Sequence, residues 1–406
     1  MADFGGGDPE AFRKEVREWV EANFPAELKG RPNPMMREER AKPSEAQEAW
    51  RKAVGSKGWG TPTWPAQYGG GGLSAAEARV IQQEFGRAGA YNPIGGMGVM
   101  MFGPTLLEYG TEDQKLEHIP LICRGDVQWC QGFSEPGAGS DLAALQTRAE
   151  DKGDHFLING QKIWTSGAHT ADWCFCLVRT DTSKKHEGIS FVLIDMHQPG
   201  VEARPIRLIN DTTPFCETFF TDAVAKKEDL VGPLNGGWTI GKRLLQHERQ
   251  GISGAGGGIN SGAYALPGPV LPELARRYVG LDAEGRLADT DLRRRIADHM
   301  MECQAFALTG QRAAAEARTN TGPSAASSVL KNVGSKVRMA RGELSLEVLG
   351  HQGLGWGGEQ FSADEQGVIK YVLRSKAGAI AGGSWEVQLN IISKRILGLP
   401  ETTQKG

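Results

Sequence analysis

The chain changes character around one loop, Phe133-Ser134-Glu135-Pro136-Gly137-Ala138-Gly139-Ser140-Asp141. Its proline and glycines fix a turn that can present backbone N–H groups outward, and the hydroxyl groups of Ser134 and Ser140 stand beside that turn. Such a loop can hold the polar edge of a planar ring or a phosphate. The same composition also suits a plain turn followed by a cap, so the loop alone leaves both interpretations open.

Short runs of period two, separated by turn residues, follow this loop. Asn159-Gly160 stands between two such runs and predicts a β-hairpin, because this dipeptide suits a two-residue primed turn. Together the runs indicate an antiparallel barrel or sandwich of about 100 residues. We expect its further strands at Trp173–Val178, Ile189–Asp195, Val201–Arg207 and Glu217–Thr221.

Apolar residues recur at helical spacing on both sides of this β region. Before it, Asp8-Pro9-Glu10 indicates a helix start, and residues 45–58 and 74–89 repeat the helical pattern. After Gly236 the helical pattern returns, and it predicts a long helix over Val329–Leu349. A second helix is expected to place on one face Leu292, Ile296, Met300 and Cys303.

This order predicts an α+β protein of three domains. We expect an N-terminal helical domain at residues 1–128, a middle antiparallel β-barrel domain at 129–233 and a C-terminal helical bundle domain at 234–406. A chain of this length can bury a sizeable core.

Composition excludes several classes of protein. Glycine accounts for 55 of the 406 residues, about twice the usual share. It has no period of three, so collagen is excluded. With 14 Phe, 10 Trp and 23% charged residues of both signs, a disordered chain is not expected. A net charge of −3 argues against a nucleic-acid partner.

The sequence also bears on location. The longest apolar runs, such as Ile189–Asp195, are far shorter than a membrane span, and Met1–Glu10 has no signal-peptide character. The six cysteines lie mostly in apolar contexts, which predicts reduced core thiols, and no histidine stands at ligand spacing from them. We therefore expect a cytoplasmic protein that binds neither a membrane nor a metal ion.

A second informative stretch is Gln161-Lys162-Ile163-Trp164-Thr165-Ser166-Gly167-Ala168. An aromatic side chain followed by hydroxyl residues can form a wall for a flat cofactor. A Trp at the end of a strand is also often part of the core. The methionines between Met97 and Met101 leave a similar choice, because such a stripe either fills a core or lines a pocket.

The two stretches and their spacing resemble the acyl-CoA dehydrogenase family. Three further segments match it: Trp-Pro-x-x-Tyr-Gly-Gly at 64–70, Tyr-Gly-Thr-Glu-Asp-Gln-Lys at 109–115, and Asp229-Leu230-Val231-Gly232. The resemblance covers nearly the whole chain. It implies the same helical, β and helical order, with four helices in the last domain, and binding of FAD and a CoA thioester. The implied reaction removes an α proton and a β hydride from the acyl group, and flavin N5 accepts the hydride.

The resemblance also implies residue roles. Phe133, Ser134, Gly139 and Ser140 line the flavin and the thioester, and Trp164 and Ser166 lie against the isoalloxazine. Gly350-His351-Gln352-Gly353 stands where a Gly-Gly-Asn-Gly turn is usual, near the ADP half of FAD. Further residues are assigned to the cofactor, Ser384 and Glu386, or to the substrate, Ser140, Met97 and Met101.

The catalytic base departs from the family pattern. The usual base is a Glu in a Tyr-Glu-Gly-Thr motif, and here Gly382 holds that position. Some branches carry the base on the first long C-terminal helix before an Arg, and Glu248-Arg249 matches that site. We therefore expect Glu248 to be the base, with Arg249 beside it in the catalytic group. Glu386, four residues past the usual site, and a chain without a base are the alternatives, and Glu248 read alone also suits a solvated helix acid.

Gly382 keeps one function in this interpretation. In the family the backbone N–H at this position donates to the thioester carbonyl, and a glycine retains that donor. The missing side chain also opens space, which suits a bulky, branched or steroid-derived acyl group.

The implied partners are an acyl-CoA substrate and an electron-transfer flavoprotein as acceptor. The family's Arg-x-x-Phe-Gly run, whose Arg binds the FAD of a neighbouring subunit, is poorly matched by Leu274-Ala275-Arg276-Arg277-Tyr278-Val279-Gly280. A homotetramer and a heterotetramer whose partner completes the FAD site both remain open. Other open functions are a non-catalytic subunit and a different flavin reaction, such as that of an oxidase or a desulfinase.

Overall fold

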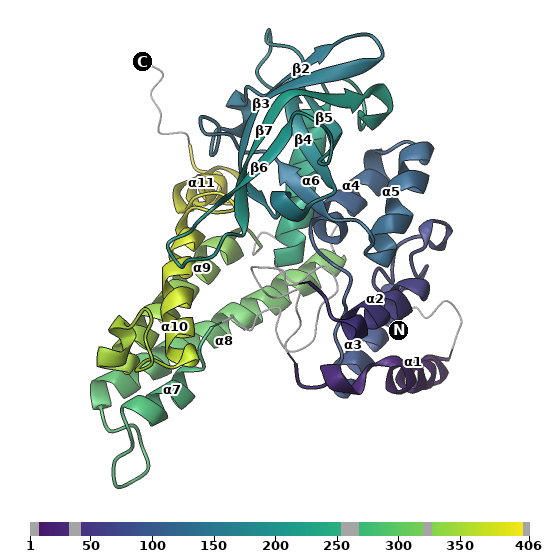
Figure 1. The fold of residues 1–406 in the computed structure, drawn as a ribbon. Helices are drawn as coiled ribbons and strands as arrows, with labels where there is room; N and C mark the ends of the chain where they lie inside the picture. Colours follow the sequence, from purple (N-terminus) through teal and green to yellow (C-terminus); the bar gives the residue numbers. More distant parts are fainter. Residues whose placement is uncertain (1–7, 32–41, 253–267, 320–326, 401–406) are drawn as a thin grey trace, which may run out of the picture. The chain divides into compact units, whose positions relative to one another are not determined.

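The structure is a computed structural model and describes residues 8–31, 42–252, 268–319 and 327–400 (Figure 1). The chain forms two compact units. The first unit runs to Ile252, apart from the short segment Leu208–Asp211, and the second unit contains that segment and the later helices. Each unit is described by itself.

The N-terminal part of the first unit is helical. Asp8 accepts a hydrogen bond from the Glu10 amide, which confirms the predicted helix start. Ser44, Ser74 and Thr111 begin later helices with reciprocal capping boxes, which satisfy otherwise unpaired amides. A π-helical turn, Gly98–Phe102, leads into one of the helices. The helices are α1 (Pro9–Asn23), α2 (Glu45–Ser56), α3 (Ala75–Ala88), α4 (Gly103–Tyr109) and α5 (Glu112–Arg124).

Seven strands in the described part of the chain form one mixed sheet, in the order β1-β4-β2-β3-β7-β6 with β5 paired to β4. Most pairs are antiparallel, and β1 runs parallel to β4. The strands predicted after residue 170 are confirmed. The strands are β1 (Trp129–Gly132), β2 (Arg148–Asp151), β3 (His155–Ser166), β4 (Trp173–Arg179), β5 (Ile189–Asp195), β6 (Val201–Ile206) and β7 (Phe215–Lys226).

The predicted hairpin at Asn159-Gly160 is wrong, because β3 runs through this dipeptide without a turn. The register between β3 and β7 shifts here, and the Asn159 side chain donates to Asp222 Oδ1 over 2.9 Å while accepting from the Asp222 amide. A Cβ on Gly160 would lie 2.6 Å from Thr147 Cα. The glycine therefore serves a bulge and a close backbone approach, a use that the dipeptide shares with primed turns.

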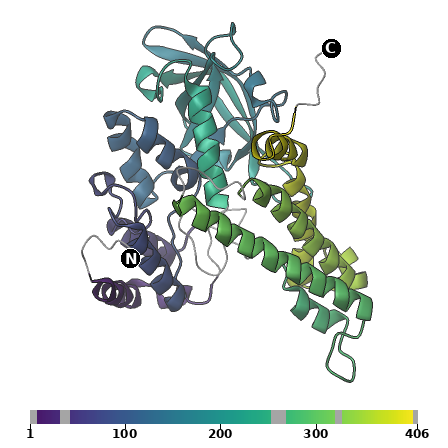
Figure 2. The ribbon, with the colours of Figure 1, turned by 180° about the vertical axis from the view of Figure 1, so that it is seen from behind.

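The helix α6 (Gly237–Ile252) completes the first unit and packs against β5 and α4 (Figure 2). Its Leu244 is fully buried in the core that the helices share with the sheet, and Leu245 packs against the same core. The segment that leads from β7 toward α6 contains Asp229, which is buried and accepts from the Lys226 amide over 3.1 Å. Burial is the main reason why the pKa of Asp229 is raised to about 6.

The second unit is helical. Its helices pack around α9, which confirms the helix expected over 329–349. The predicted apolar face of α8 is buried at Leu292 and Ile296 but exposed at Met300. The helices are α7 (Leu271–Tyr278), α8 (Thr290–Thr319), α9 (Ser327–Leu349), α10 (Ala363–Ser375) and α11 (Trp385–Ile391).

All six cysteines lie among the described residues and have free thiols. Cys303, on α8, is the one that is partly exposed, and the other five are buried in the first unit. Burial raises the pKa of the Cys123 thiol, and the pKa values of Cys174 and Cys176 lie well above their ordinary value.

Among the described residues, no helix combines the length and apolar character that crossing a bilayer requires. They also contain no group of three or more His, Cys, Asp or Glu side chains arranged to hold a metal ion.

Candidate cofactor and substrate site

The loop at residues 133–141 is a tight turn. The Glu135 and Ala138 backbones exchange hydrogen bonds of 3.1 and 3.0 Å, and Pro136 and Gly137 form the exposed tip. The Ile163 amide donates to the Ser134 carbonyl over 2.9 Å, which ties the turn to β3. Phe133 is buried at its base.

The exposed side of this turn carries free polar groups. Gly139 and Ser140 are exposed, and a Cβ on Gly137 or Gly139 would meet nothing within 4 Å. Within the described part of the chain, the amides of Gly139 and Ser140 have no acceptor. The turn therefore offers backbone donors and a hydroxyl group to a ligand that approaches from outside.

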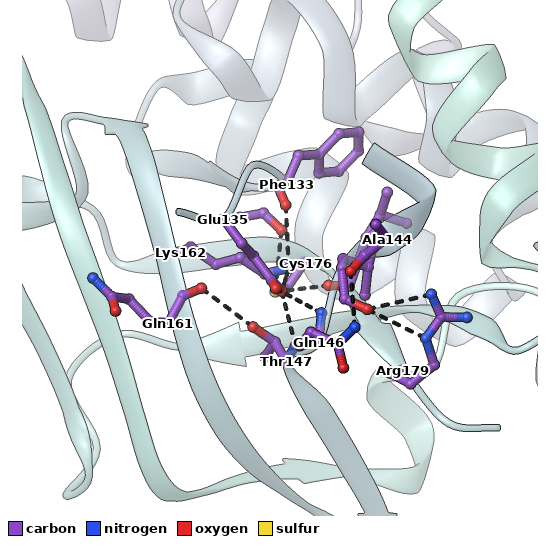
Figure 3. Close-up of polar contacts among 12 residues, drawn as sticks. Phe133, Glu135, Ala144, Gln146, Thr147, Gln161, Lys162, Cys176 and Arg179 are labelled. Atoms are coloured by element: carbon purple, nitrogen blue, oxygen red, sulfur yellow. Dashed lines mark hydrogen bonds and ion pairs between the residues drawn. The ribbon is translucent and has the colours of Figure 1, made fainter. Parts of the chain in front are cut away.

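A buried ion pair supports the turn from behind (Figure 3). Lys162 Nζ donates to Glu135 Oε1 over 2.8 Å and to the Phe133 carbonyl over 3.2 Å. The Glu135 carboxylate also accepts from the amides of Gln146, over 2.6 Å, and Thr147, over 2.8 Å. Burial opposes ionisation, but Lys162 and these donors hold the pKa of Glu135 below its ordinary value.

Arg179 fixes the segment between the turn and β2. Its guanidinium is buried and donates to the carbonyls of Ala143, over 2.6 Å, and Leu145, over 3.3 Å. It also donates to the Lys185 carbonyl over 2.8 Å. Because these bonds satisfy backbone groups on both sides, the loops around the turn form one rigid frame.

Trp164 is 53% exposed, so the alternative that it fills the core is wrong. Its φ is +61°, a left-handed value that is costly for a residue with a side chain, and the register between β3 and β7 shifts beside it. This irregularity lets the flat indole face solvent next to the strand end at Ser166. The indole has one ring contact, edge-on to Phe215.

These features fit a flavin. An exposed indole face and the hydroxyl of Ser166 come from β3, and amide donors with the Ser140 hydroxyl come from the turn at 133–141. A flat ring with a polar edge needs both kinds of group. The β3 residues and the turn are joined directly through Ile163 and Ser134.

Glu248 and Arg249 lie near the end of α6, and their side chains fall outside the described residues. The preceding turn of α6 is described. Arg243 donates to both Glu108 carboxylate oxygens on α4, over 2.7 and 2.8 Å, and His247 Nε2 lies 3.2 Å from Glu108 Oε1. Arg243 is the main reason why the pKa of Glu108 is lowered. This network fixes α6 against α4 one turn before Glu248.

Met97 and Met101 differ in burial. Met101 is buried in the core cluster that also holds Phe102 and Leu106, and Met97 is partly buried and packs against that cluster. Of the two methionines, Met97 is therefore the one whose side chain is partly accessible.

The second unit holds Gly382 in a turn with a left-handed backbone. Gly382 and Gly383 have φ values of +67° and +92°, in the left-handed region that favours glycine. Lys331 donates to the Gly383 carbonyl, and Gln388 Nε2 donates to the Gly382 carbonyl over 3.3 Å. These bonds fix the orientation of the peptide groups at the position that the resemblance assigns to the family's usual base.

Ser384 and Glu386 follow this turn. The Ser384 hydroxyl caps α11 by accepting from the Val387 amide over 3.4 Å. Glu386 is exposed in the first turn of that helix, and its own backbone amide is the main reason why its pKa is lowered.

Gly350-His351-Gln352-Gly353 forms a 3-10 turn after α9, and Gly350 has a φ of +54°. His351 is exposed. Gln352 is held inside the unit, because its Nε2 donates to Glu365 Oε1 over 3.2 Å. Glu365 also accepts from the Tyr278 hydroxyl over 2.6 Å, and this bond is the main reason why the pKa of Glu365 falls to about 2.

The structure thus brings together the predicted residues of the first unit around the turn and β3, while Gly350–Gly353 and Gly382–Glu386 belong to the second unit. Two networks were missed from the sequence: Glu135 with Lys162, and Glu108 with Arg243. Strand period carried a signal for Lys162, because it lies an even number of residues from the buried Phe156 and Ile158. A lysine on that inward face requires a buried partner.

A helical domain, a β domain with an exposed indole beside a donor-rich turn, and a second helical unit define a flavoprotein dehydrogenase of the acyl-CoA type. Three family models match in sequence: acyl-CoA dehydrogenase N-terminal domain at 7–126, middle domain at 130–223 and C-terminal domain at 235–397. The chain belongs to the acyl-CoA dehydrogenase family, which confirms the predicted fold class and the enzyme class.

Individual proteins similar to this chain support the same family. The chain is 38% identical over 404 residues to acyl-CoA dehydrogenase IpdE1 of Mycobacterium tuberculosis, covering 97% of this chain and 98% of the relative. It is similar to the solved Tcur3481-Tcur3483 steroid ACAD, with a TM-score of 0.74, 29% identity and coverage of 98% and 99%. The ChsE4-ChsE5 complex from Mycobacterium tuberculosis gives a TM-score of 0.71, 28% identity and coverage of 97% and 98%. These similarities support the predicted relation to the branch that includes steroid members.

Proposed function

We propose that this protein is an FAD-dependent enzyme that introduces an α,β double bond into an acyl-CoA thioester. The observation that carries the proposal is the exposed, strained Trp164 beside the donor-rich turn at 133–141, in a chain that matches the family over nearly its full length. When bound, FAD supplies the acceptor for the β hydride.

The first unit would hold the flavin ring through Phe133, Ser134, Gly139, Ser140, Trp164 and Ser166. Their support is the exposed donor face of the turn and the exposed indole. The second unit would contribute Gly350, His351, Gln352, Gly353, Ser384 and Glu386. Gln352 and Ser384 already have partners within the unit, so their contribution would be to shape the turns that carry the backbone donors.

Glu248 is the proposed base for the α proton, with Arg249 beside it. Three observations support this assignment. Gly382 has no carboxylate at the usual position, Glu248 precedes an Arg as in the alternative branch, and the Glu108–Arg243 pair holds the preceding turn of α6 in place. The Gly382 N–H is the proposed donor to the thioester carbonyl, since a polarised carbonyl makes the α proton more acidic.

The proposed substrate is a bulky, branched or steroid-derived acyl group. Gly382 leaves free the volume that a Glu side chain fills elsewhere in the family, and one similar structure is that of a steroid ACAD. Ser140, Met97 and Met101 are the proposed contacts to the substrate from the first unit.

The proposed assembly is a tetramer, of identical chains or with a second kind of chain, that passes electrons to an electron-transfer flavoprotein in the cytoplasm. The similarity to the ChsE4-ChsE5 complex supports the mixed form. The proposed domain limits are 1–128, 129–233 and 234–406, and α6 starts the third domain in sequence while packing in the first unit.

The test is anaerobic mixing of the purified flavoprotein with straight-chain, branched and steroid acyl-CoA thioesters. We expect bleaching of the flavin absorption by the bulky substrates and little oxygen uptake in air. Rapid oxygen uptake would instead indicate an oxidase. A colourless chain that acquires flavin only with a second chain would indicate a subunit that needs a partner. Bleaching by short straight chains alone would contradict the substrate proposal.

A further inference from the structure

One pair of opposite charges is almost fully buried. The Lys162 side chain is 0% exposed and that of Glu135 is 6% exposed, and the two side chains meet at 2.8 Å. A buried ion pair loses much of its attraction to desolvation, so it contributes little net stability compared with well-packed apolar side chains. Its presence at this place therefore calls for a reason other than the stability of the fold.

The pair joins three separate backbone segments. Lys162 is part of β3, and Glu135 is part of the turn at 133–141. The carboxylate also holds the amides of Gln146 and Thr147, which lead into β2 (Figure 3). All of these groups have partners with good geometry, so the arrangement is specific rather than a loose attraction.

Each end of the pair is next to a residue of the proposed flavin site. Ser134 directly precedes Glu135, and Trp164 comes two residues after Lys162. Between them, the Ile163 amide binds the Ser134 carbonyl. The backbone at Trp164 is held at a φ of +61°, which persists only where surrounding contacts determine it. The buried ion pair therefore lies directly beside both parts of the proposed flavin site, the turn at 133–141 and Trp164.

We propose that the Glu135–Lys162 ion pair is a positioning device that sets the distance and angle between the turn at 133–141 and Trp164, and so organises the flavin site before the cofactor binds. This inference rests on the proposed function. It assigns no contact with the cofactor to either charged side chain. Both act through the backbone that they hold, and both lie behind the donors that face outward.

The central variant is Lys162→Met, which keeps most of the length of the side chain and removes its charge. Because this change leaves Glu135 unpaired, the second variant is Glu135→Gln/Lys162→Met, in which neither member of the pair carries a charge. The matched control is Glu84→Gln. Glu84 is also buried and paired, with Arg13 at 3.0 Å and Arg17 at 2.9 Å, but it lies on α3 away from the turn and β3.

Three readouts test the proposal, and the first two start from the full-length apoprotein. Hydrogen exchange reports the order of the segments 133–141 and 161–167, and titration with FAD gives the dissociation constant. We expect both Lys162 variants to exchange faster in these two segments and to bind FAD about 10-fold more weakly, as when support behind a ligand group is removed. The flavin absorption band should also change shape. The Glu84 variant should match the wild type in all three readouts.

The outcomes separate the two proposals. If the wild-type chain, alone or with its partner chain, binds no FAD, both the proposed function and this inference are overturned. If the wild type binds FAD and the double variant binds it equally well, only the inference is overturned. Faster exchange with unchanged FAD affinity would also overturn it, because the pair would then serve the fold alone.

Discussion

At the residue scale, the proposed chemistry rests on two residues, Glu248 and Gly382. Glu248 follows the turn of α6 that the Glu108–Arg243 pair holds against α4. Gly382 stands at the position that the resemblance assigns to the family's usual base. The sequence was sufficient to single out both residues. It could not show that Gly382 has a left-handed backbone, because a positive φ depends on the contacts of the turn and not on glycine itself.

Glu248→Gln should abolish most turnover, because the amide cannot accept the α proton. We expect anaerobic flavin reduction by a good acyl-CoA substrate to slow about 100-fold or more, with FAD content unchanged. Stopped-flow absorption measures this rate. Glu18→Gln, an exposed change on α1, should leave the rate unaltered. A normal rate in the Glu248 variant together with loss in Glu386→Gln would transfer the role to Glu386.

Gly382→Ala should destabilise the second unit by about 1–2 kcal/mol, because a Cβ is unfavourable at a φ of +67°. Chemical denaturation followed by circular dichroism measures the change. The control is Gly367→Ala, in the middle of α10, where a Cβ meets nothing within 4 Å. That substitution should stabilise the protein by about 0.5–1 kcal/mol. Equal effects of the two substitutions on the free energy of unfolding would refute the left-handed backbone at Gly382.

At the scale of elements, the period of the sequence predicted the later strands and the long helix α9 because side-chain burial imposes that period. It failed at Asn159-Gly160, where the local preference for a turn is overridden by pairing with β2 and β7 on both sides. It also could not show the ion pairs behind the site, since Glu135 and Lys162 are 27 residues apart and meet only in the folded sheet.

The segment between β7 and α6 should make stability depend on pH through Asp229. Its pKa is raised to about 6 from an ordinary 3.8, so the folded protein binds this proton more tightly than the unfolded chain. The resulting stabilisation is complete below about 3.8 and is lost as the pH rises through about 6. The full effect is about 3 kcal/mol.

Asp229→Asn should remove this dependence, because the amide stays neutral and can still accept from the Lys226 amide. We expect the variant to be more stable than the wild type at pH 8 and about equal to it at pH 4. Melting temperatures across this range measure the effect, with the exposed Asp113→Asn as the control. A wild-type pH slope that persists in the Asp229 variant would locate the titrating group elsewhere.

At the scale of the whole molecule, the second unit presents apolar side chains that the described part of the chain leaves exposed. Met301 and Leu308 on α8 are 64% and 52% exposed and stand seven residues apart, on one helix face. In the proposed tetramer this face would bury itself against another protomer. Met301→Asp with Leu308→Asp should therefore lower the assembly mass while the helical circular dichroism of the chain persists. Light scattering after size exclusion measures the mass, and an unchanged tetramer would exclude this face from the assembly.

Because of where its thiols lie, cysteine labelling can follow the unfolding of this protein. Five cysteines are buried in the first unit, and the sixth, Cys303, is partly exposed in the second. A maleimide added under rising denaturant should label Cys303 first, and mass spectrometry should then find Cys130, Cys174 and Cys176 labelled together once the sheet opens. The order of labelling therefore shows which unit opens first, and no cysteine has to be introduced.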